Sequence, residues 1–328
     1  MDIREAVKNS PRALVLAITG WIINVLVTAA LCKVLLGWRL LNGLLLGSIV
    51  GGGSSIIVIA LIRKLKVTEK LETVLSLESI LTDVLCTVGA FTAINILLPA
   101  VSEGGEAAVS GSINLGSALG SVGAAFGVGI LVGLSFGVAW IVILERIKGK
   151  PNAYMLTLAM LFLTFVVATN LEGNGALSAL FFGLIIGNSR HIAKRLKFRT
   201  TISIDNSVRD FHSQISFLIR SFFFVFTGLL FSLSSFTSVA IGLVLSFTFL
   251  GIRFVVVKMA TVKSELNTYQ TLMTVMLPRG LAAAVLASIP LTSGIPGSQV
   301  FPEIAFIVIL TTIITCTVGV AVIKKRQT

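Results

Sequence analysis

Charged residues are scarce in this chain of 328 residues, because Asp, Glu, Lys and Arg together make up 12% of it. The 3 cysteines, Cys32, Cys86 and Cys316, are far apart and lie inside apolar runs, so they support neither a disulfide framework nor a metal site. We expect them to pack against lipid or the protein core. The sequence shows no nucleophile with a neighbouring base, no metal cluster and no Walker phosphate loop. We therefore expect neither an enzyme nor a bound cofactor.

Hydrophobic residues make up 55% of the chain, and the mean hydropathy is +1.00. A helix of about 20 apolar residues spans the roughly 30 Å hydrocarbon core of a bilayer, whereas strands of a membrane barrel are ten-residue alternating segments. We expect an all-α integral membrane protein with about ten transmembrane helices. The expected spans are 13–36, 41–62, 74–98, 120–144, 153–170, 173–186, 213–233, 239–258, 268–289 and 301–323.

The 26 Lys and Arg residues predict the topology of these spans. If the N-terminus is cytoplasmic, the outer segments hold just Lys33 and Arg39, and the other basic residues between spans lie inside. Because cytoplasmic loops retain positive charge, we expect a multi-pass protein of the cell membrane with both termini cytoplasmic. The basic residues form short clusters without interleaved aromatics, so we expect no nucleic-acid partner.

Two of the expected spans carry helix-breaking residues near their middle. The second span holds three glycines followed by two serines, and the ninth holds a Pro-Arg-Gly stretch: Gly51, Gly52, Gly53, Ser54 and Ser55, then Pro278, Arg279 and Gly280. Glycine weakens a helix by about 1 kcal/mol relative to Ala, and proline removes a backbone hydrogen bond. The two spans run in opposite directions, which is typical of inverted-repeat transporters with two broken helices crossing at a midplane site. Alternatively, the glycines permit close helix packing.

The third span carries two acids, Glu78 and Asp83, inside an apolar run. A charge at the centre of a membrane helix costs about 2.5 to 3.5 kcal/mol on insertion scales, so both acids need a compensating role. Asp83 lies about nine residues, or roughly 13 Å, from the inner end of the span, near mid-bilayer. Glu78 is expected to form a structural ion pair with an intramembrane arginine, either Arg253 or Arg279. The alternative for Asp83 is the same structural role.

Oxygen atoms hold hard cations such as Na⁺, and a lone carboxylate can carry either a cation or a proton. With positions i and i+4 on one helix face, Ser79 is expected to share the face of Asp83, and Thr82 that of Glu78. We therefore predict a site for a transported monovalent cation or a proton at Asp83. Its further oxygen ligands would come from Ser79, Thr82, Ser54 and Ser55.

Three stretches resemble the cation:proton antiporter family, in its single-aspartate, NhaP-like sodium/proton exchanger branch. The stretch Glu78-Ser79-x-x-Thr82-Asp83 resembles the family signature Glu-Ser-x-x-Asn-Asp, and Leu277 to Leu281 resembles the Pro-Arg-Gly stretch of its second broken helix. Ile219 to Leu229 resembles the helix before the final core repeat. The resemblance implies that Asp83 binds the ion or proton, that Ser79 and Thr82 are neighbouring ligands, and that one cation is exchanged for one proton.

The chain departs from the family pattern in two places. It has Gly53-Ser54-Ser55 where members commonly have Thr-Asp-Pro, so a frequent ion-site acid is missing. Met1 aligns just after the third span of the family, so we expect the first three spans, and half of the dimerisation scaffold, to be absent. The implied organisation is a cytoplasmic N-terminus (1–12), a first core repeat (13–98), an outer loop (99–119), linker and scaffold spans (120–233), a second core repeat (234–323) and a tail (324–328).

Taken together, these features predict a secondary active transporter that exchanges Na⁺ or K⁺ for protons, electroneutrally. A homodimer is expected if the scaffold spans are present. Two alternatives remain open from the sequence. One is a sodium-coupled symporter of an organic anion with the same fold, which would need a roomier polar cavity. The other is a truncated remnant that does not transport.

Overall fold

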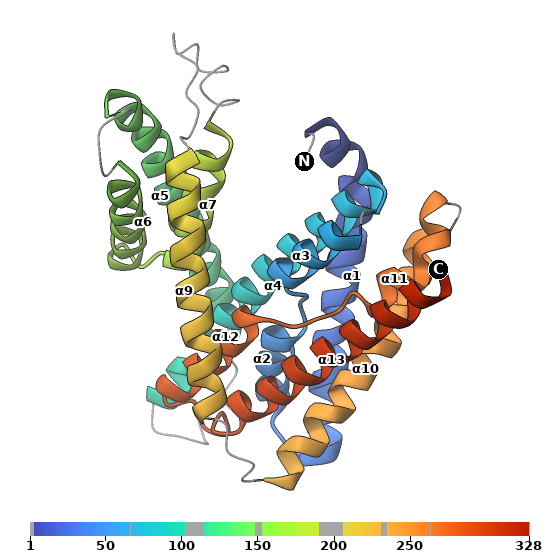
Figure 1. Ribbon diagram of the computed structural model, residues 1–328. Coiled ribbons are helices and arrows are strands. Elements are labelled where there is room, and N and C mark those ends of the chain that lie inside the picture. Colours follow the sequence, from blue (N-terminus) through green and yellow to red (C-terminus); the bar gives the residue numbers. More distant parts are fainter. Residues whose placement is uncertain are drawn as a thin grey trace. The chain divides into compact units, whose positions relative to one another are not determined.

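The computed structural model describes residues 3–65, 67–102, 115–147, 153–189, 206–230, 235–262 and 264–327. The regular elements in these ranges are helices (Figure 1). They are α1 (Ile3–Leu36), α2 (Leu40–Val50), α3 (Ser55–Leu65), α4 (Glu69–Ser102), α5 (Leu115–Arg146), α6 (Ala153–Asn170), α7 (Gly175–Gly187), α9 (Asn206–Leu230), α10 (Phe236–Thr261), the 3₁₀ helix η1 (Glu265–Tyr269), α11 (Gln270–Val275), α12 (Leu281–Thr292) and α13 (Phe301–Gln327).

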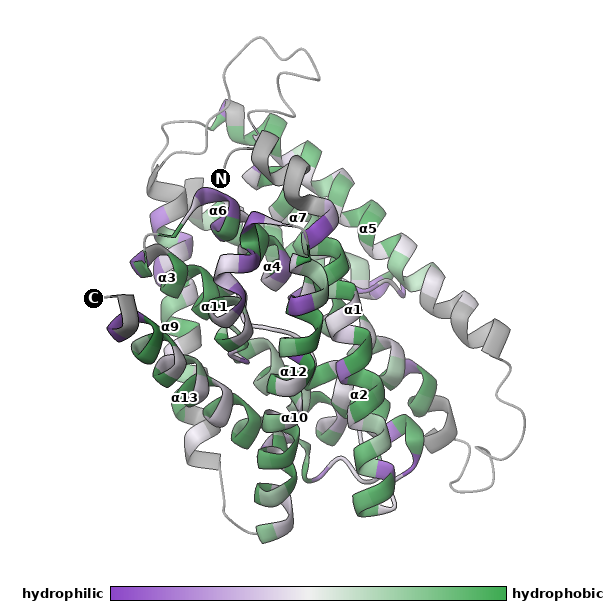
Figure 2. Ribbon diagram, turned by 90° about the vertical axis from the view of Figure 1, so that its right-hand side faces the viewer, coloured by the Kyte–Doolittle hydropathy of each residue, from purple (hydrophilic) through white to green (hydrophobic). Residues whose placement is uncertain are grey.

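Six helical stretches in the described residues are long and apolar enough to cross a membrane. They are Pro11–Leu36, Leu40–Ile62, Glu69–Leu98, Gly123–Leu144, Phe236–Thr261 and Phe301–Lys325. Shorter apolar helices occupy Met155–Asn170, Gly175–Gly187 and Leu281–Thr292. Hydrophobic residues dominate most of the helical surface in Figure 2. The expectation of an all-helical, multi-pass membrane protein is therefore confirmed.

Several helices are longer than the apolar runs that predicted them. The first begins at Ile3 instead of Ala13, α4 continues to Ser102, and α13 continues to Gln327. A helix satisfies its own backbone hydrogen bonds, so it can continue past the last apolar residue into the interfacial region. Parts of the expected outer loop and cytoplasmic segments are consequently helical, and residues 103–114 of that loop lie outside the described residues.

The chain divides into two compact units, of which the first comprises Met1–Ser110 and Phe223–Thr328. In this unit α1 packs against α2, α4 and α10, and α13 packs against α10 and α12. Its buried apolar side chains form two clusters, one that includes Leu45 and Phe249 and one that includes Leu16 and Leu75. All three cysteines are buried, which confirms them as core-facing packing residues.

Both interrupted spans lie in this first unit, and their interruptions touch (Figure 1). The helix stops between α2 and α3 at residues 51–54, and between α11 and α12 at residues 276–280. The Ser54 amide donates a hydrogen bond of 2.7 Å to the Pro278 carbonyl oxygen. A Cβ atom on Gly52 would lie 2.5 Å from Cys86 Sγ and 2.8 Å from the Thr82 carbonyl oxygen. Glycine at this position therefore lets the first break lie directly against α4.

The second unit, Gly111–Phe222, contains α5, α6, α7 and most of α9. Glycines spaced by four residues on α5 face α7, and a Cβ on Gly129 would lie 2.6 Å from the Asn174 carbonyl oxygen. Small residues at this spacing allow membrane helices to approach closely. The side chain of Asn174 caps α7 by accepting a hydrogen bond of 2.9 Å from the Leu177 amide.

The contact between α1 and α2 gives a direct test of the packing in the first unit. A Cβ on Gly47 would lie 2.8 Å from both Cα and the carbonyl oxygen of Val25. Those backbone atoms cannot move aside as a flexible side chain could. Gly47→Val is therefore expected to lower the free energy of unfolding by about 1 to 3 kcal/mol or more through overpacking. The measurement is the thermal unfolding midpoint of the detergent-solubilised protein. The matched control is Gly251→Val, at a glycine with nothing within 4 Å of the added Cβ. Equal midpoints for the two variants would contradict the close helix approach.

Candidate functional site

The carboxylate of Asp83 lies beside the break between α2 and α3. Its Oδ2 atom accepts hydrogen bonds from the hydroxyl of Ser55, at 2.5 Å, and from the backbone amide of the same residue, at 3.3 Å. Ser55 is the first residue of α3, so the positive end of that helix dipole faces the carboxylate. Asp83 itself is half-buried in the middle of α4. The first break thus supplies both a hydroxyl oxygen and a favourable field for a negative charge.

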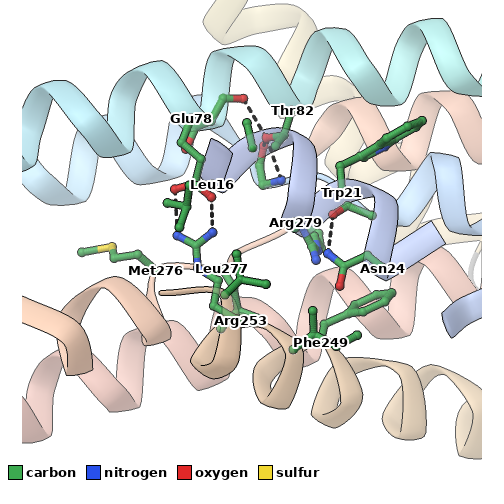
Figure 3. Close-up of a pocket in the computed structure, with 17 residues that line it drawn as sticks. Leu16, Trp21, Asn24, Glu78, Thr82, Phe249, Arg253, Met276, Leu277 and Arg279 are labelled. Atoms are coloured by element: carbon green, nitrogen blue, oxygen red, sulfur yellow. Dashed lines mark hydrogen bonds and ion pairs between the residues drawn. The ribbon is translucent and has the colours of Figure 1, made fainter. Parts of the chain in front are cut away.

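A small chamber lies beside the same break, entirely within the first unit (Figure 3). Its volume is about 20 Å³, and its walls come from α1, α4, α10 and the two breaks. Glu78, Ser79 and Thr82 of α4 line it, together with Arg253 and Arg279. Asp83 is not part of this lining. Since each residue turns a helix by about 100°, residues 78, 82 and 79 form one continuous sector, and Asp83 lies at its edge.

Glu78 pairs with Arg253, one of the two partners that the sequence left open. The guanidinium meets the carboxylate through two contacts, Nη1 with Oε1 and Nη2 with Oε2, the second at 3.0 Å (Figure 3). Nε of Arg253 also donates to the Met273 carbonyl oxygen at 3.0 Å. The Glu78 and Arg253 side chains are 5% and 16% exposed. This buried, bidentate pair links α4 to α10 and to the end of α11.

Arg279 occupies a different environment from Arg253. Its backbone amide donates to Thr312 Oγ1 at 3.0 Å, and its guanidinium lies 4.9 Å from the centre of the Phe249 ring. Its Nε atom is buried without a hydrogen-bond partner. Among the described residues, therefore, Arg279 lines the chamber as a buried cation whose side chain does not pair with Glu78.

The other predicted oxygen ligands surround the first break without bonding to Asp83 in the described structure. Thr82 Oγ1 accepts a hydrogen bond of 3.2 Å from the Gly53 amide and donates one of 3.0 Å to the Ser79 carbonyl oxygen. Ser54 is buried against Gly280, where a Cβ would collide with its side chain. Of the four predicted hydroxyl residues, the structure brings Ser55 into contact with the carboxylate.

Sequence reasoning missed two polar residues that support the breaks. Asn24 of α1 donates from Nδ2 to the Gly51 carbonyl oxygen at 2.8 Å, satisfying a carbonyl at the end of α2. Thr312 of α13 holds the Arg279 amide in the second break. Both are polar residues inside apolar spans, which is a signal that can point to such roles before a structure is known.

Comparisons with known proteins agree with this architecture. The family model described as sodium/hydrogen exchanger, transmembrane, matches residues 1–325. The K(+)/H(+) antiporter NhaP2 of Shewanella sp. strain ANA-3 is 27% identical over 309 residues, covering 92% of this chain and 50% of that protein. The Na(+)/H(+) antiporter ApNhaP of Aphanothece halophytica is 27% identical over 226 residues, covering 69% and 40%. The chain thus spans about half the length of the curated relatives it matches, or less.

The fold is also similar to a solved structure. The sodium proton antiporter MjNhaP1 of Methanocaldococcus jannaschii at pH 8 matches with a TM-score of 0.73 and 20% identity, over 98% of this chain and 78% of that one. The family model covers nearly the whole chain, which confirms at family level the resemblance seen in its motifs. The chain belongs to the sodium/hydrogen exchanger family of transmembrane proteins.

Proposed function

We propose that this chain forms the ion-translocating part of an antiporter that exchanges Na⁺ or K⁺ for protons. The observation that carries the proposal is the position of Asp83, a half-buried carboxylate in the middle of a membrane-spanning helix, bonded to Ser55 at a helix break. An acid inside a membrane span is costly and marks an ion or proton path. Relatives named as K(+)/H(+) and Na(+)/H(+) antiporters support the same cargo.

In this mechanism the Asp83 carboxylate binds either a cation or a proton, and the two compete for it. The Ser55 hydroxyl can turn its oxygen lone pairs toward a cation when its hydrogen bond to the carboxylate is released. Thr82, Ser79 and Ser54 lie around the same break and provide further oxygens. Since one carboxylate carries a single positive charge in either direction, exchange of one cation for one proton is electroneutral.

The Glu78–Arg253 pair has a structural role in this proposal. Both side chains already use their charges on each other, and Arg253 additionally holds a carbonyl oxygen of α11. A buried pair of this kind keeps α4, α10 and α11 in one arrangement around the breaks. Asp83 is then free to exchange its cargo without disturbing the packing of the helices that carry it.

The proposed organisation follows the sequence expectations. About ten spans cross the membrane, with core repeats at 13–98 and 234–323 in inverted orientation, both termini cytoplasmic and the broken helices crossing near the midplane. The first compact unit contains both proposed repeats, and the second contains most of the proposed scaffold. A symporter of an organic anion would need a roomier polar cavity than the 20 Å³ chamber found among the described residues.

Asp83→Asn is the decisive test of the proposed mechanism. The amide keeps the size of the side chain but cannot carry a proton or neutralise a cation, so cation-driven proton movement should fall to background. The measurement is the internal pH of proteoliposomes after addition of Na⁺, K⁺ or Li⁺, which also identifies the cargo. The control is Glu69→Gln, which neutralises an exposed acid at the start of the same helix and should transport normally. Full exchange by the Asp83 variant would remove this carboxylate from the mechanism.

The proposed structural pair is tested by stability instead of transport. Glu78→Gln leaves the Arg253 charge buried without its counter-ion, and a broken pair of this kind costs about 3 to 5 kcal/mol. Replacing both residues by Met should recover much of that loss, because no unpaired charge remains. The measurement is the thermal unfolding midpoint.

A surface ion pair in the same unit provides the control for this series. Lys70 and Glu265 are 2.6 Å apart, with side chains 30% and 84% exposed. Because water screens this pair, Lys70→Met should lower the free energy of unfolding by about 1 kcal/mol or less. If Glu78→Gln unfolds at the same temperature as Lys70→Met, the Glu78–Arg253 pair does not hold the helices together.

A further inference from the structure

The charges that line the chamber do not balance. Glu78, Arg253 and Arg279 are the charged residues of its wall. The first two neutralise each other in a bidentate pair. Arg279 is 4% exposed, and within the described residues it has no ion pair of its own. The Asp83 carboxylate is close enough for its charge to act on Arg279, but the buried Nε of Arg279 has no hydrogen-bond acceptor, and a buried donor without an acceptor is costly.

Arg279 also has N–H groups left without protein acceptors. A guanidinium carries five N–H donors and no acceptor. The Phe249 ring covers one face of the guanidinium, so it does not accept hydrogen bonds from the N–H groups, which point outward in the plane of that group. Nε is buried without a partner, and no hydrogen bond from the side chain to another described residue is found. Figure 3 shows the guanidinium at the chamber, near Asn24.

Nearby acceptors are already engaged elsewhere. The Gly51 carbonyl oxygen receives Asn24 Nδ2, and the Met273 carbonyl oxygen receives Arg253 Nε. The carboxylate of Asp83 receives Ser55 and lies outside the chamber wall, although it is close enough to Arg279 for their charges to interact. One buried acceptor on the wall has no partner, Asn24 Oδ1. Two buried donors on the wall, Arg279 Nε and Trp21 Nε1, also have no hydrogen-bond partner.

We propose that this chamber binds one small monovalent anion of halide size, held by the Arg279 guanidinium. The anion accepts the free N–H groups of that guanidinium. The volume allows one small occupant, because one water needs about 10 to 15 Å³ and the chamber measures about 20 Å³. The inference stands on the chamber itself and does not depend on the transport role of Asp83.

The first test compares thermal unfolding of the purified protein in sodium bromide and in sodium gluconate, at equal sodium concentration and ionic strength. Bromide is a single small ion, whereas gluconate is too large for the chamber. The unfolding midpoint should rise with the logarithm of the bromide concentration, by about 3 °C at ten times the dissociation constant. Arg279→Met removes the charge and should abolish the difference between the salts. Asp83→Asn should retain it, so this proposal and the proposed function can fail separately.

The second test needs no variant and so does not depend on the folding of Arg279→Met. Crystals of the unaltered protein grown in sodium bromide should give an anomalous difference peak within hydrogen-bond distance of the Arg279 guanidinium. Equal unfolding midpoints in the two salts, or a chamber that holds water without an anomalous peak, would overturn the proposal. A bromide response that survives Arg279→Met would place the anion elsewhere and overturn it equally.

Discussion

Buried charge at the helix breaks is the constraint on which the first unit depends. Four ionisable side chains lie near the two breaks: Glu78, Asp83, Arg253 and Arg279. Low-dielectric surroundings make each of them costly unless a partner is held in place. Glu78 and Arg253 form an ion pair with each other, and the Asp83 carboxylate accepts hydrogen bonds from Ser55 in the first turn of α3. Arg279 is the member of the group whose side chain lacks a hydrogen-bonded partner in the described residues, and that imbalance distinguishes the chamber from a packed core.

The breaks are possible because small residues let backbones meet. Gly52 lies against α4 and Gly280 against Ser54, and side chains at either position would collide with those neighbours. The hydrogen bond from the Ser54 amide to the Pro278 oxygen then joins the two interruptions directly. Backbone groups that leave a helix within a membrane must find new partners, and here each break supplies partners for the other. The glycines thus have both of the roles considered from the sequence: they interrupt the helix, and they permit close packing.

Neighbouring positions of α4 take part in two kinds of chemistry. Glu78, Ser79 and Thr82 line the chamber, whereas the Asp83 carboxylate bonds to Ser55 and is not part of the chamber wall. Ser79 and Asp83 are four residues apart and offset by about 40° around the helix, so Asp83 lies at the edge of the sector that lines the chamber. The proposed transport site and the proposed anion site therefore share a helix and a break without sharing ligands.

The sequence by itself determined the membrane class, the positions of the helix interruptions and the two acids in need of partners. Each of these depends on the local composition of one segment, through hydropathy, the helix propensity of Gly and Pro, and the cost of a carboxylate in lipid. Tertiary structure alone decided that Glu78 meets Arg253 instead of Arg279, that Ser55 is the hydroxyl on Asp83, and that Asn24 and Thr312 support the breaks. Those pairings join helices far apart in the chain, and they depend on helix rotation and depth, which the pattern of one segment does not specify.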